Sequence, residues 1–418
     1  ELAGLPYIRV PHVRKALGVA AHALAGNPTH NMTVIGVTGT NGKSSSVSLA
    51  RHILVQSGIK AACFGTLGYE FDEETIAAPH TTPFGEDLAA LFQKAKDTGH
   101  THVAMEVSSH ALEQERVAGI RFRTALFTNL TQDHLDYHLN MEAYLQAKLS
   151  LFERIEGADA FTVVNRDDPY SNAFIQASRV PCITCGGQGD CHATGIRTEA
   201  GRTFFQVHTP WGSSEAAMRW LGLHNVSNAL GIIALCGGLG ISLDMIIRAL
   251  ASMPCVPGRF EHVDAGQPFQ VIVDYAHTDD GLRNVLRAAR GISSGRLMVV
   301  FGCGGDRDRT KRPKMGAVVA ELSDYAIITS DNPRTERPEQ ILLDIEVGIR
   351  QKGWRKDDHY LVMLDRAEAI RRAIHMAGPG DLVLIAGKGH EDYQIVGSQR
   401  LPFDDRLVAR AVLEARFG

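Results

Sequence analysis

The sequence predicts an α/β protein in which two mostly parallel sheets follow one another along the chain. Short apolar strands alternate with helical patterns, as in βα units. A glycine-rich phosphate-loop motif stands between the first strand and its helix. Prolines interrupt the pattern near residue 254, and the alternation of strands and helices then starts again. We therefore expect a P-loop-type central domain with a mostly parallel sheet, followed by a smaller doubly wound, Rossmann-like C-terminal domain.

Length and charge limit the classes of function. The chain has 418 residues, enough for two or three domains, and 44% of them are hydrophobic. It carries 43 Lys and Arg against 47 Asp and Glu, so no basic surface argues for nucleic acid. No apolar run approaches about 18 residues, no signal peptide is visible, and the seven cysteines do not make a full disulfide framework. We expect a cytoplasmic monomer without a membrane span, whose partners are small molecules.

The first part of the chain predicts a lead-in segment and one large domain. Residues 1–30 contain one amphipathic stretch, 10–24, which is typical of a single helix. For residues 31–254 we expect a domain of alternating strands and helices, with short antiparallel strands at 194–208. The expected strands are 32–37, 61–65, 101–105, 124–127, 160–164 and 180–184, and the expected helices are 47–56, 86–96, 141–154, 224–236 and 243–252.

Residues 255–418 predict the smaller domain, with about six strands. The apolar pattern marks strands at 269–273, 296–301, 325–329, 360–364 and 382–386. Four of them are followed by polar or glycine-rich segments, at 274–277, 302–308, 330–334 and 387–391. Ligands of such sheets bind beyond the carboxyl ends of the strands. We therefore expect these four segments to form one site that faces the phosphate loop across a cleft.

The phosphate loop is the segment Thr38-Gly39-Thr40-Asn41-Gly42-Lys43-Ser44, followed by Ser45. Glycines let backbone N–H groups turn toward a phosphate, and the helix N-terminus adds partial positive charge. Lys43 can reach the β- and γ-phosphates, and the Ser44 hydroxyl can bind Mg²⁺. Val37 stands where the usual consensus has its first glycine, so this is a variant loop. The alternative is an ordinary turn between a strand and a helix.

Two further side chains are candidate metal ligands: Glu106 for Mg²⁺, which takes hard oxygen ligands, and His134 for a second metal ion. Glu106 follows an apolar strand, as a Walker-B acid does, and His134 follows the next strand. Their alternatives are a solvated glutamate at a strand end and a histidine that caps the next turn. Lys148 lies beside the apolar face of its helix, and composition alone favours a solvated lysine there.

The cysteines raise one separate question. Cys182, Cys185, Cys191 and His192 have the spacing C-x2-C-x5-C-H, which is compatible with a zinc knuckle. The first two cysteines flank the end of an expected strand, and a glycine-rich loop follows. We favour free thiols at a strand end over a zinc site.

Charged residues of the second domain predict a site for an amino acid with more than one charged end. Arginine captures carboxylates through two parallel hydrogen bonds. The alternative for each arginine is a salt bridge at the surface or between domains. Two arginine motifs, together with Asp331, Asn332 and Glu391, could hold such an amino acid. The charged and titratable residues that this half of the chain supplies are Arg259, Asp274, His277, Arg307 and Arg334.

Together these motifs resemble the Mur ligases of peptidoglycan synthesis. The resemblance runs from about residue 10 to the end of the chain. The segments 301–308 and 387–391 narrow it to the members that add the third residue of the peptide. It rests on the phosphate loop and on the segments Glu106-Val107-Ser108-Ser109-His110, Asn129-Leu130-Thr131-Gln132-Asp133-His134-Leu135-Asp136, His224-Asn225-x-x-Asn228 and Asp274-Tyr275-Ala276-His277.

The resemblance implies a role for each matching position. Lys43 and Ser44 would bind phosphate and Mg²⁺, and Glu106 and His134 would bind metal. Lys148 matches the lysine that the family carbamylates with CO₂, which converts an ammonium into an anionic oxygen ligand. The nucleotide contacts would be Gly39, Thr40, Asn41, Gly42, Lys43, Ser44, Ser45, Asn228, Arg259 and Asp274. The UDP-muramoyl dipeptide would contact Thr81, Thr82, Ser109 and Arg116, and diaminopimelate would contact Arg307, Asp331, Asn332, Arg334, Gly387 and Glu391.

The implied activity is the ATP-dependent addition of meso-diaminopimelate to UDP-N-acetylmuramoyl-L-alanyl-D-glutamate through an acyl phosphate. His277 would assist deprotonation of the attacking amine. The segment Asp331-Asn332-Pro333-Arg334 goes with diaminopimelate, because Arg334 can pair with a distal carboxylate that lysine lacks.

Three alternatives to this activity stay open: addition of L-lysine, a folylpolyglutamate-type reaction, and a catalytically silent scaffold. The family's N-terminal uridine-binding domain has no counterpart in the sequence, and residues 1–30 fit only its tail and linker. The resemblance therefore does not by itself imply tight binding of the UDP-linked substrate.

Overall fold

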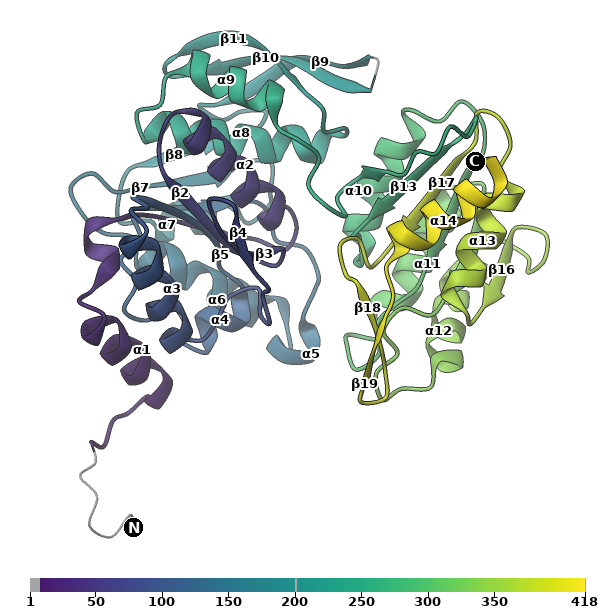
Figure 1. Cartoon of the computed structure of the whole chain (residues 1–418), viewed down its shortest axis with the longest axis horizontal. Helices are drawn as coiled ribbons and strands as arrows, with labels where there is room; N and C mark the ends of the chain where they lie inside the picture. Colours follow the sequence, from purple (N-terminus) through teal and green to yellow (C-terminus); the bar gives the residue numbers. More distant parts are fainter. Residues whose placement is uncertain (1–7, 200, 418) are drawn as a thin grey trace.

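The computed structural model describes residues 8–199 and 201–417 of the chain. Residues 1–7 of the expected lead-in segment lie outside this part. Figure 1 shows two α/β units, built around different sheets, and the chain passes from one to the other after helix α9 (Leu243–Ser252). The predicted fold class, two α/β units with mostly parallel sheets, is confirmed. The domain limits 31–254 and 255–418 remain predictions.

The first sheet has eight strands in the order β4-β3-β2-β5-β1-β6-β7-β8. Six of them are parallel, and β3 and β4 extend the sheet as an antiparallel hairpin. The strands are β1 (Thr33–Thr38), β2 (Ala61–Gly65), β3 (Gly68–Phe71), β4 (Glu74–Ile76), β5 (His102–Glu106), β6 (Thr124–Phe127), β7 (Phe161–Asn165) and β8 (Cys182–Cys185).

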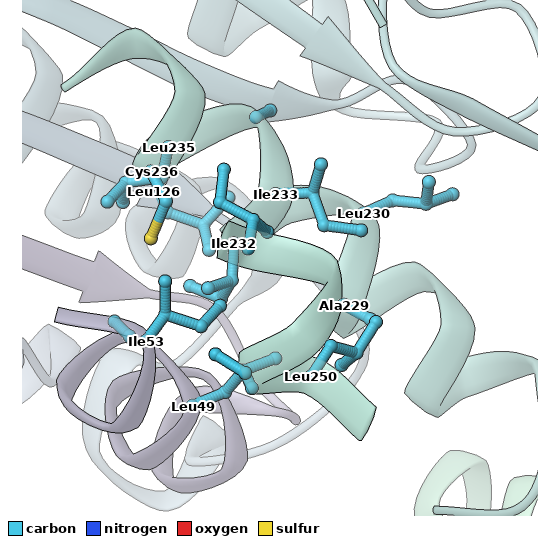
Figure 2. Close-up of a cluster of buried hydrophobic side chains, with 14 of the residues drawn as sticks. Leu49, Ile53, Leu126, Ala229, Leu230, Ile232, Ile233, Leu235, Cys236 and Leu250 are labelled. Atoms are coloured by element: carbon cyan, nitrogen blue, oxygen red, sulfur yellow. The ribbon is translucent and has the colours of Figure 1, made fainter. Parts of the chain in front are cut away.

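Helices cover both faces of this sheet, which explains the continuous apolar run in β1. Ile35 and Val37 face one core and Val34 faces the other, as the alternation of a strand requires. Figure 2 shows the first core, where side chains of α2, α8 and α9 meet. The helices are α1 (Val13–Leu24), the 3₁₀ helix η1 (Pro28–Asn31), α2 (Lys43–Gln56), α3 (Gly85–Asp97), α4 (Ser109–Glu113), α5 (Leu135–His138), α6 (Met141–Glu153), α7 (Ser171–Ala177) and α8 (Leu223–Gly238).

A small antiparallel sheet packs beside α8 and α9, with the order β11-β10-β9. Its strands are β9 (His192–Glu199), β10 (Arg202–Thr209) and β11 (Gly212–Met218). The expected hairpin at 194–208 is thus present, and a third strand completes it.

The second unit is doubly wound, with the strand order β12-β13-β17-β14-β15-β16. All neighbours are parallel except β12, and two buried cores lie on opposite faces of the sheet. A separate hairpin, β18 (Tyr393–Val396) and β19 (Gln399–Pro402), was not expected from the sequence. The other strands are β12 (Glu261–His262), β13 (Gln270–Asp274), β14 (Leu297–Phe301), β15 (Tyr325–Thr329), β16 (Tyr360–Met363) and β17 (Leu382–Ala386). The helices are α10 (Asp279–Arg290), α11 (Lys311–Leu322), α12 (Pro338–Gln351), α13 (Arg366–Met376) and α14 (Asp405–Phe417).

Most expected elements match to within a few residues, and the exceptions have local causes. Helix α2 begins at Lys43, four residues before the expected start, because the phosphate loop runs directly into it. Short elements such as α4, α5 and α7 were missed because four to seven residues carry too little periodicity to mark a helix. Within the described residues, no helix combines the length and apolar character that a bilayer crossing needs.

Candidate active site

The phosphate loop lies between β1 and α2 and is packed closely against α8 and the segment after β6. Gly42 has φ of +86°, and a Cβ there would lie 2.3 Å from Oδ1 of Asn228. A side chain at Gly39 would lie 1.9 Å from Oγ1 of Thr128. Both positions therefore require glycine. The Nζ atom of Lys43 donates to the carbonyl oxygens of Gly39 and Thr40 at 2.9 Å, and burial lowers its pKa.

A cavity of about 560 Å³ opens in front of this loop and receives side chains from both units. We call it the main cavity. Arg259 crosses it: its Nη2 lies 3.1 Å from the Ser44 hydroxyl, and its guanidinium stacks 4.3 Å from the ring centre of Tyr275. Of the predicted nucleotide contacts, those that line the main cavity are Thr40, Asn41, Gly42, Lys43, Ser44, Ser45, Asn228, Arg259 and Asp274.

Asp274 ends β13 and is held by backbone donors. Its two carboxylate oxygens accept from the N–H groups of Phe260 and Ala276, both at 2.7 Å. Burial nevertheless raises the pKa of Asp274, and Arg259 opposes that shift. The carboxylate therefore fixes the turn that carries Arg259 to the phosphate loop.

The three candidate metal ligands Ser44, Glu106 and His134 line the main cavity together. Glu106 is buried at the end of β5, and its Oε1 accepts from the N–H of Thr66 at 2.8 Å. A Cβ on Gly65 would lie 2.4 Å from that oxygen, so the glycine makes room for the carboxylate. Burial lowers the pKa of His134 to about 3 against the opposing charge of Asp133, which leaves a neutral imidazole. The Ser44 hydroxyl and the Glu106 carboxylate are oxygen donors of the kind that Mg²⁺ prefers, and His134 offers a neutral nitrogen beside them.

Lys148 is buried in α6, so the solvated lysine that composition favoured is wrong. Its Nζ lies 2.8 Å from the carbonyl oxygen of Gly39 and 4.7 Å from the ring centre of Tyr144. Burial, together with the charge of Lys43, holds the pKa of Lys148 well below its usual value. The helix itself was predicted correctly. The sequence does not show that the phosphate loop packs against this position of the helix.

The four residues predicted for the muramoyl dipeptide gather at the end of β5. The Thr82 hydroxyl donates to the carbonyl oxygen of Glu106 at 2.9 Å, and Thr81 accepts from the Thr66 hydroxyl at 3.0 Å. Arg116 donates to the carbonyl oxygen of Thr82 at 2.9 Å. The Ser109 hydroxyl lies 2.9 Å from the ring nitrogen Nε2 of His138. Of the four, Thr81 lines the main cavity.

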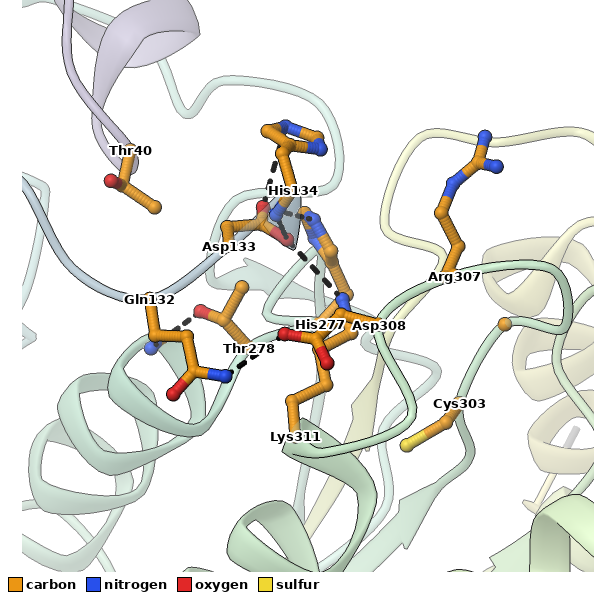
Figure 3. Close-up of polar contacts among 12 residues, drawn as sticks. Thr40, Gln132, Asp133, His134, His277, Thr278, Cys303, Arg307, Asp308 and Lys311 are labelled. Carbon is orange, nitrogen blue, oxygen red and sulfur yellow. Dashed lines mark hydrogen bonds and ion pairs between the residues drawn. The ribbon is translucent and has the colours of Figure 1, made fainter. Parts of the chain in front are cut away.

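Asp133 connects the two units, although no role of its own was predicted for it. Its carboxylate lies 3.5 Å from Nε2 of His134, 3.7 Å from Nε2 of His277 and 3.5 Å from Nζ of Lys311 (Figure 3). Burial alone would raise its pKa, but Lys311, His134 and His277 outweigh burial and hold it well below the usual range. In the sequence, its position directly before His134 in the segment 129–136 was the feature that pointed to a role in the site.

Other side chains join the units around the same edge. Gln132 donates to the carboxylate of Asp308 at 2.9 Å and to the Thr310 hydroxyl at 2.8 Å. From the phosphate loop, Asn41 donates to the carboxylate of Asp280 at 3.1 Å. The phosphate loop and the segment after β6 therefore both contact the second unit directly.

The residues predicted to bind the amino acid form a second group, outside the main cavity, at the ends of β14, β15 and β17. We call it the Arg334 cluster. Arg334 has φ of +51°, is half-buried, and donates to the carbonyl oxygen of Gly305 at 2.8 Å. Asn332 donates to Glu391 at 2.9 Å. A Cβ on Gly387 would lie 2.7 Å from Oδ2 of Asp331. The other members are Arg307 and Lys388. Lys388 lies in the predicted segment 387–391, but no role was predicted for it.

The cysteines show no metal site. In residues 8–199 and 201–417, no three or more His, Cys, Asp or Glu side chains gather as a metal would require. Cys182 and Cys185 belong to β8, as expected, and all seven cysteines are free thiols.

Comparisons with known proteins agree with this arrangement. The family model of the Mur ligase middle domain matches residues 37–236, and that of the Mur ligase glutamate ligase domain matches residues 258–389. A relative from Geobacillus thermodenitrificans, UDP-N-acetylmuramoyl-L-alanyl-D-glutamate--2,6-diaminopimelate ligase, is 46% identical over 99% of this chain and 85% of its own. A relative with the same name from Syntrophomonas wolfei is 44% identical over 98% of this chain and 84% of its own.

Solved structures give the same result. A structure of a UDP-N-acetylmuramoyl-L-alanyl-D-glutamate--2,6-diaminopimelate ligase aligns with a TM-score of 0.69 and 32% identity, over 100% of this chain and 86% of that one. Folylpolyglutamate synthase from Mycobacterium tuberculosis aligns with a TM-score of 0.75 over 96% of this chain and 94% of its own, but at 17% identity it shows the fold alone. The chain belongs to the Mur ligase family of ATP-dependent ligases.

Proposed function

We propose that the chain adds meso-diaminopimelate to UDP-N-acetylmuramoyl-L-alanyl-D-glutamate, using ATP and forming an acyl phosphate. The phosphate loop, the dipeptide residues and the Arg334 cluster supply one candidate site for each of the three substrates. The relatives that bear this activity in their names match the chain over almost its whole length.

In the first step the side-chain carboxylate of the D-glutamyl residue attacks the γ-phosphate of ATP, and ADP leaves. Lys43 and the loop N–H groups stabilise the negative charge on the transferring phosphate. Ser44, Glu106 and His134 would hold Mg²⁺, which neutralises phosphate charge when it is bound. Arg259 lies against Ser44 and stacks on Tyr275, so it can pair with the nucleotide where the two units meet.

We further propose that Lys148 is carbamylated by CO₂. The reaction needs a neutral amine, and burial favours that form by lowering the pKa of Lys148. The bond forms between Nζ and the carbon of CO₂, and Nζ loses one proton. Among the described residues, the Lys148 ammonium donates to one acceptor, the carbonyl oxygen of Gly39. As a carbamate it would carry anionic oxygens toward the candidate metal ligands.

In the second step the amine of diaminopimelate attacks the acyl phosphate, and the tetrahedral intermediate expels phosphate. His277 is our candidate for accepting the proton from the amine. Its Nδ1 lies 2.9 Å from the carbonyl oxygen of Tyr275, so Nδ1 donates and Nε2 exchanges the proton. The carboxylate of Asp133 lies 3.7 Å from this Nε2.

The choice of diaminopimelate rests on Arg334. Its guanidinium is half-buried and, among the described residues, forms no salt bridge. A ligand with a distal carboxylate gives it a partner, whereas lysine leaves it unpaired. The test is mass spectrometry of the product after incubation with ATP, the UDP-linked dipeptide and either amino acid. A product only with diaminopimelate supports the proposal. A product only with lysine, or with neither, contradicts it.

The remaining expectations are proposals of the same kind. We propose a cytoplasmic site of action, because seven free thiols suit a reducing compartment. The monomeric state and the domain limits stay predictions.

A further inference from the structure

Lys388 is a buried lysine that none of the proposed steps uses. It follows β17 by two residues, and its side chain is 0% exposed. Its Nζ lies 3.0 Å from Oε2 of Glu391, 3.2 Å from Oδ1 of Asn332 and 3.9 Å from Oδ1 of Asp331. One ammonium group therefore contacts three members of the Arg334 cluster.

These contacts fix the orientation of the Asn332 amide. Its Oδ1 accepts from Lys388 and from the N–H of Ile395 at 2.9 Å, while its Nδ2 donates to Oε2 of Glu391 at 2.9 Å. A flipped amide would set its NH₂ group against two donors and lose all three hydrogen bonds. Lys388 thus holds the amide and the carboxylate as one unit, and Oε1 of Glu391 has no hydrogen-bond partner among the described residues.

The two arginines of the cluster stand in contrast to this arrangement. Arg334 donates to the carbonyl oxygen of Gly305, and Arg307 donates to that of Asp306. Neither forms a salt bridge with a carboxylate in the described part of the chain. The acids of the cluster are near, because Asp331 and Glu391 act on Arg334 through space, but they are paired with Lys388.

The second buried cation of this region, Arg366, is already paired with a different carboxylate. It makes two hydrogen bonds with Asp405, at 2.8 and 2.7 Å, and both side chains are 0% exposed. Lys388 is therefore the cation that Asp331 and Glu391 share.

We infer that Lys388 is a positioning residue that sets the specificity of the amino-acid site: it keeps the two acids paired away from Arg334, so that this guanidinium stays open to the distal carboxylate of the amino acid. The inference rests on the proposed function and specifies how its site selects a ligand. Without Lys388, Asp331 and Glu391 lose their ammonium partner and turn to Arg334, on which the charges of both already act. Once Arg334 is paired with a carboxylate of the protein, the distal carboxylate of a ligand adds less binding free energy.

The experiment compares Lys388→Met, Lys388→Arg and the surface control Lys352→Met, whose side chain is 45% exposed. The measurements are kcat/KM for diaminopimelate and for lysine, and KM for ATP. For Lys388→Met we expect a preference for diaminopimelate that is about tenfold smaller than in the wild type, with KM for ATP changed less than about twofold. Lys388→Arg and Lys352→Met should retain the preference to within about threefold.

A merely structural role would reduce both amino-acid activities equally and leave their ratio unchanged, and that outcome overturns the inference. If Lys388→Met does not fold, Lys388→Gln, which keeps a hydrogen-bond donor but no charge, is judged by the same ratio. A wild type that uses both amino acids equally would contradict the proposed function. A wild type that prefers diaminopimelate, with a Lys388→Met variant that keeps this preference, would contradict this inference alone.

Discussion

The main cavity and the Arg334 cluster are built in different ways. The main cavity takes its lining from both units, and its phosphate loop depends on glycines and backbone groups. The Arg334 cluster lies within the second unit and consists of charged side chains that hold one another. The first site is therefore completed only when the two units meet, whereas the second is preorganised in one unit. Changes at the unit junction should affect nucleotide chemistry more than amino-acid choice.

The largest effect is expected from Lys43→Ala. The lysine donates its hydrogen bonds to the carbonyl oxygens of its own loop, so the fold should persist. Turnover should fall at least about a thousandfold, because the group that stabilises the transferring phosphate is gone. Steady-state ATP hydrolysis with all substrates measures this, and Lys60→Ala, at a surface salt bridge, is the control. Wild-type turnover in the variant would remove the phosphate-loop assignment.

Lys148→Ala should cost roughly a hundredfold or more in kcat, since a carbamate that holds the metal would be lost. Short carboxylates such as formate or acetate should restore part of the rate, because they can occupy the space left by the side chain. Rescue is measured against carboxylate concentration, with Lys43→Ala as a variant that should not respond. A wild-type enzyme fully active without CO₂ or bicarbonate, and with an unmodified lysine by intact-mass analysis, would contradict the carbamate.

Asp133→Asn tests the junction between the units. The substitution keeps the shape of the side chain but removes the charge that faces Lys311 and His277. We expect kcat/KM for ATP to fall about tenfold, while the ratio of diaminopimelate to lysine use changes less than about twofold. Asp136→Asn, an exposed carboxylate three residues away, is the matched control. An altered amino-acid preference in Asp133→Asn would show that the two sites are not separable.

Asp331→Asn should produce a smaller, pH-dependent loss of stability. Burial raises the pKa of Asp331, but Lys388 and Arg366 outweigh it, so its folded pKa is lowered below the unfolded value of about 3.9. A lowered carboxyl pKa contributes stability above the unfolded pKa and loses it as pH falls through the folded pKa. The variant should be roughly 1 to 3 kcal/mol less stable than the wild type at pH 7, and this difference should disappear in acid. Urea unfolding at several pH values measures it, and a gap independent of pH would contradict the charge pairing.

The parts of the molecule that the sequence predicted well are those whose signal is local. The phosphate loop and its flanking strand and helix lie within 24 residues, from Thr33 to Gln56. The residue types of this segment by themselves predict phosphate binding. The same holds for the strands of the second sheet, whose apolar runs are bounded by turns.

The rest depends on contacts between residues far apart in the chain. Asp133 meets Lys311 across 178 residues, and Lys388 meets Asn332 across 56. Lys148 looked solvated because its helix alone does not show that Gly39 closes over it from 109 residues away. Burial and charge pairing of this kind arise only when the sheets have assembled, so residue spacing carries no sign of them.

The central claim is that an open arginine selects the amino acid. The most direct measurement is kcat/KM for diaminopimelate and for lysine, in the wild type and in Arg334→Ala. A charge-assisted contact of this type contributes about 1.5 to 3 kcal/mol, so the wild type should prefer diaminopimelate at least about tenfold. Arg334→Ala should lose most of that preference and keep its KM for ATP. Equal use of both amino acids by the wild type, or an unchanged preference in Arg334→Ala, would contradict the account.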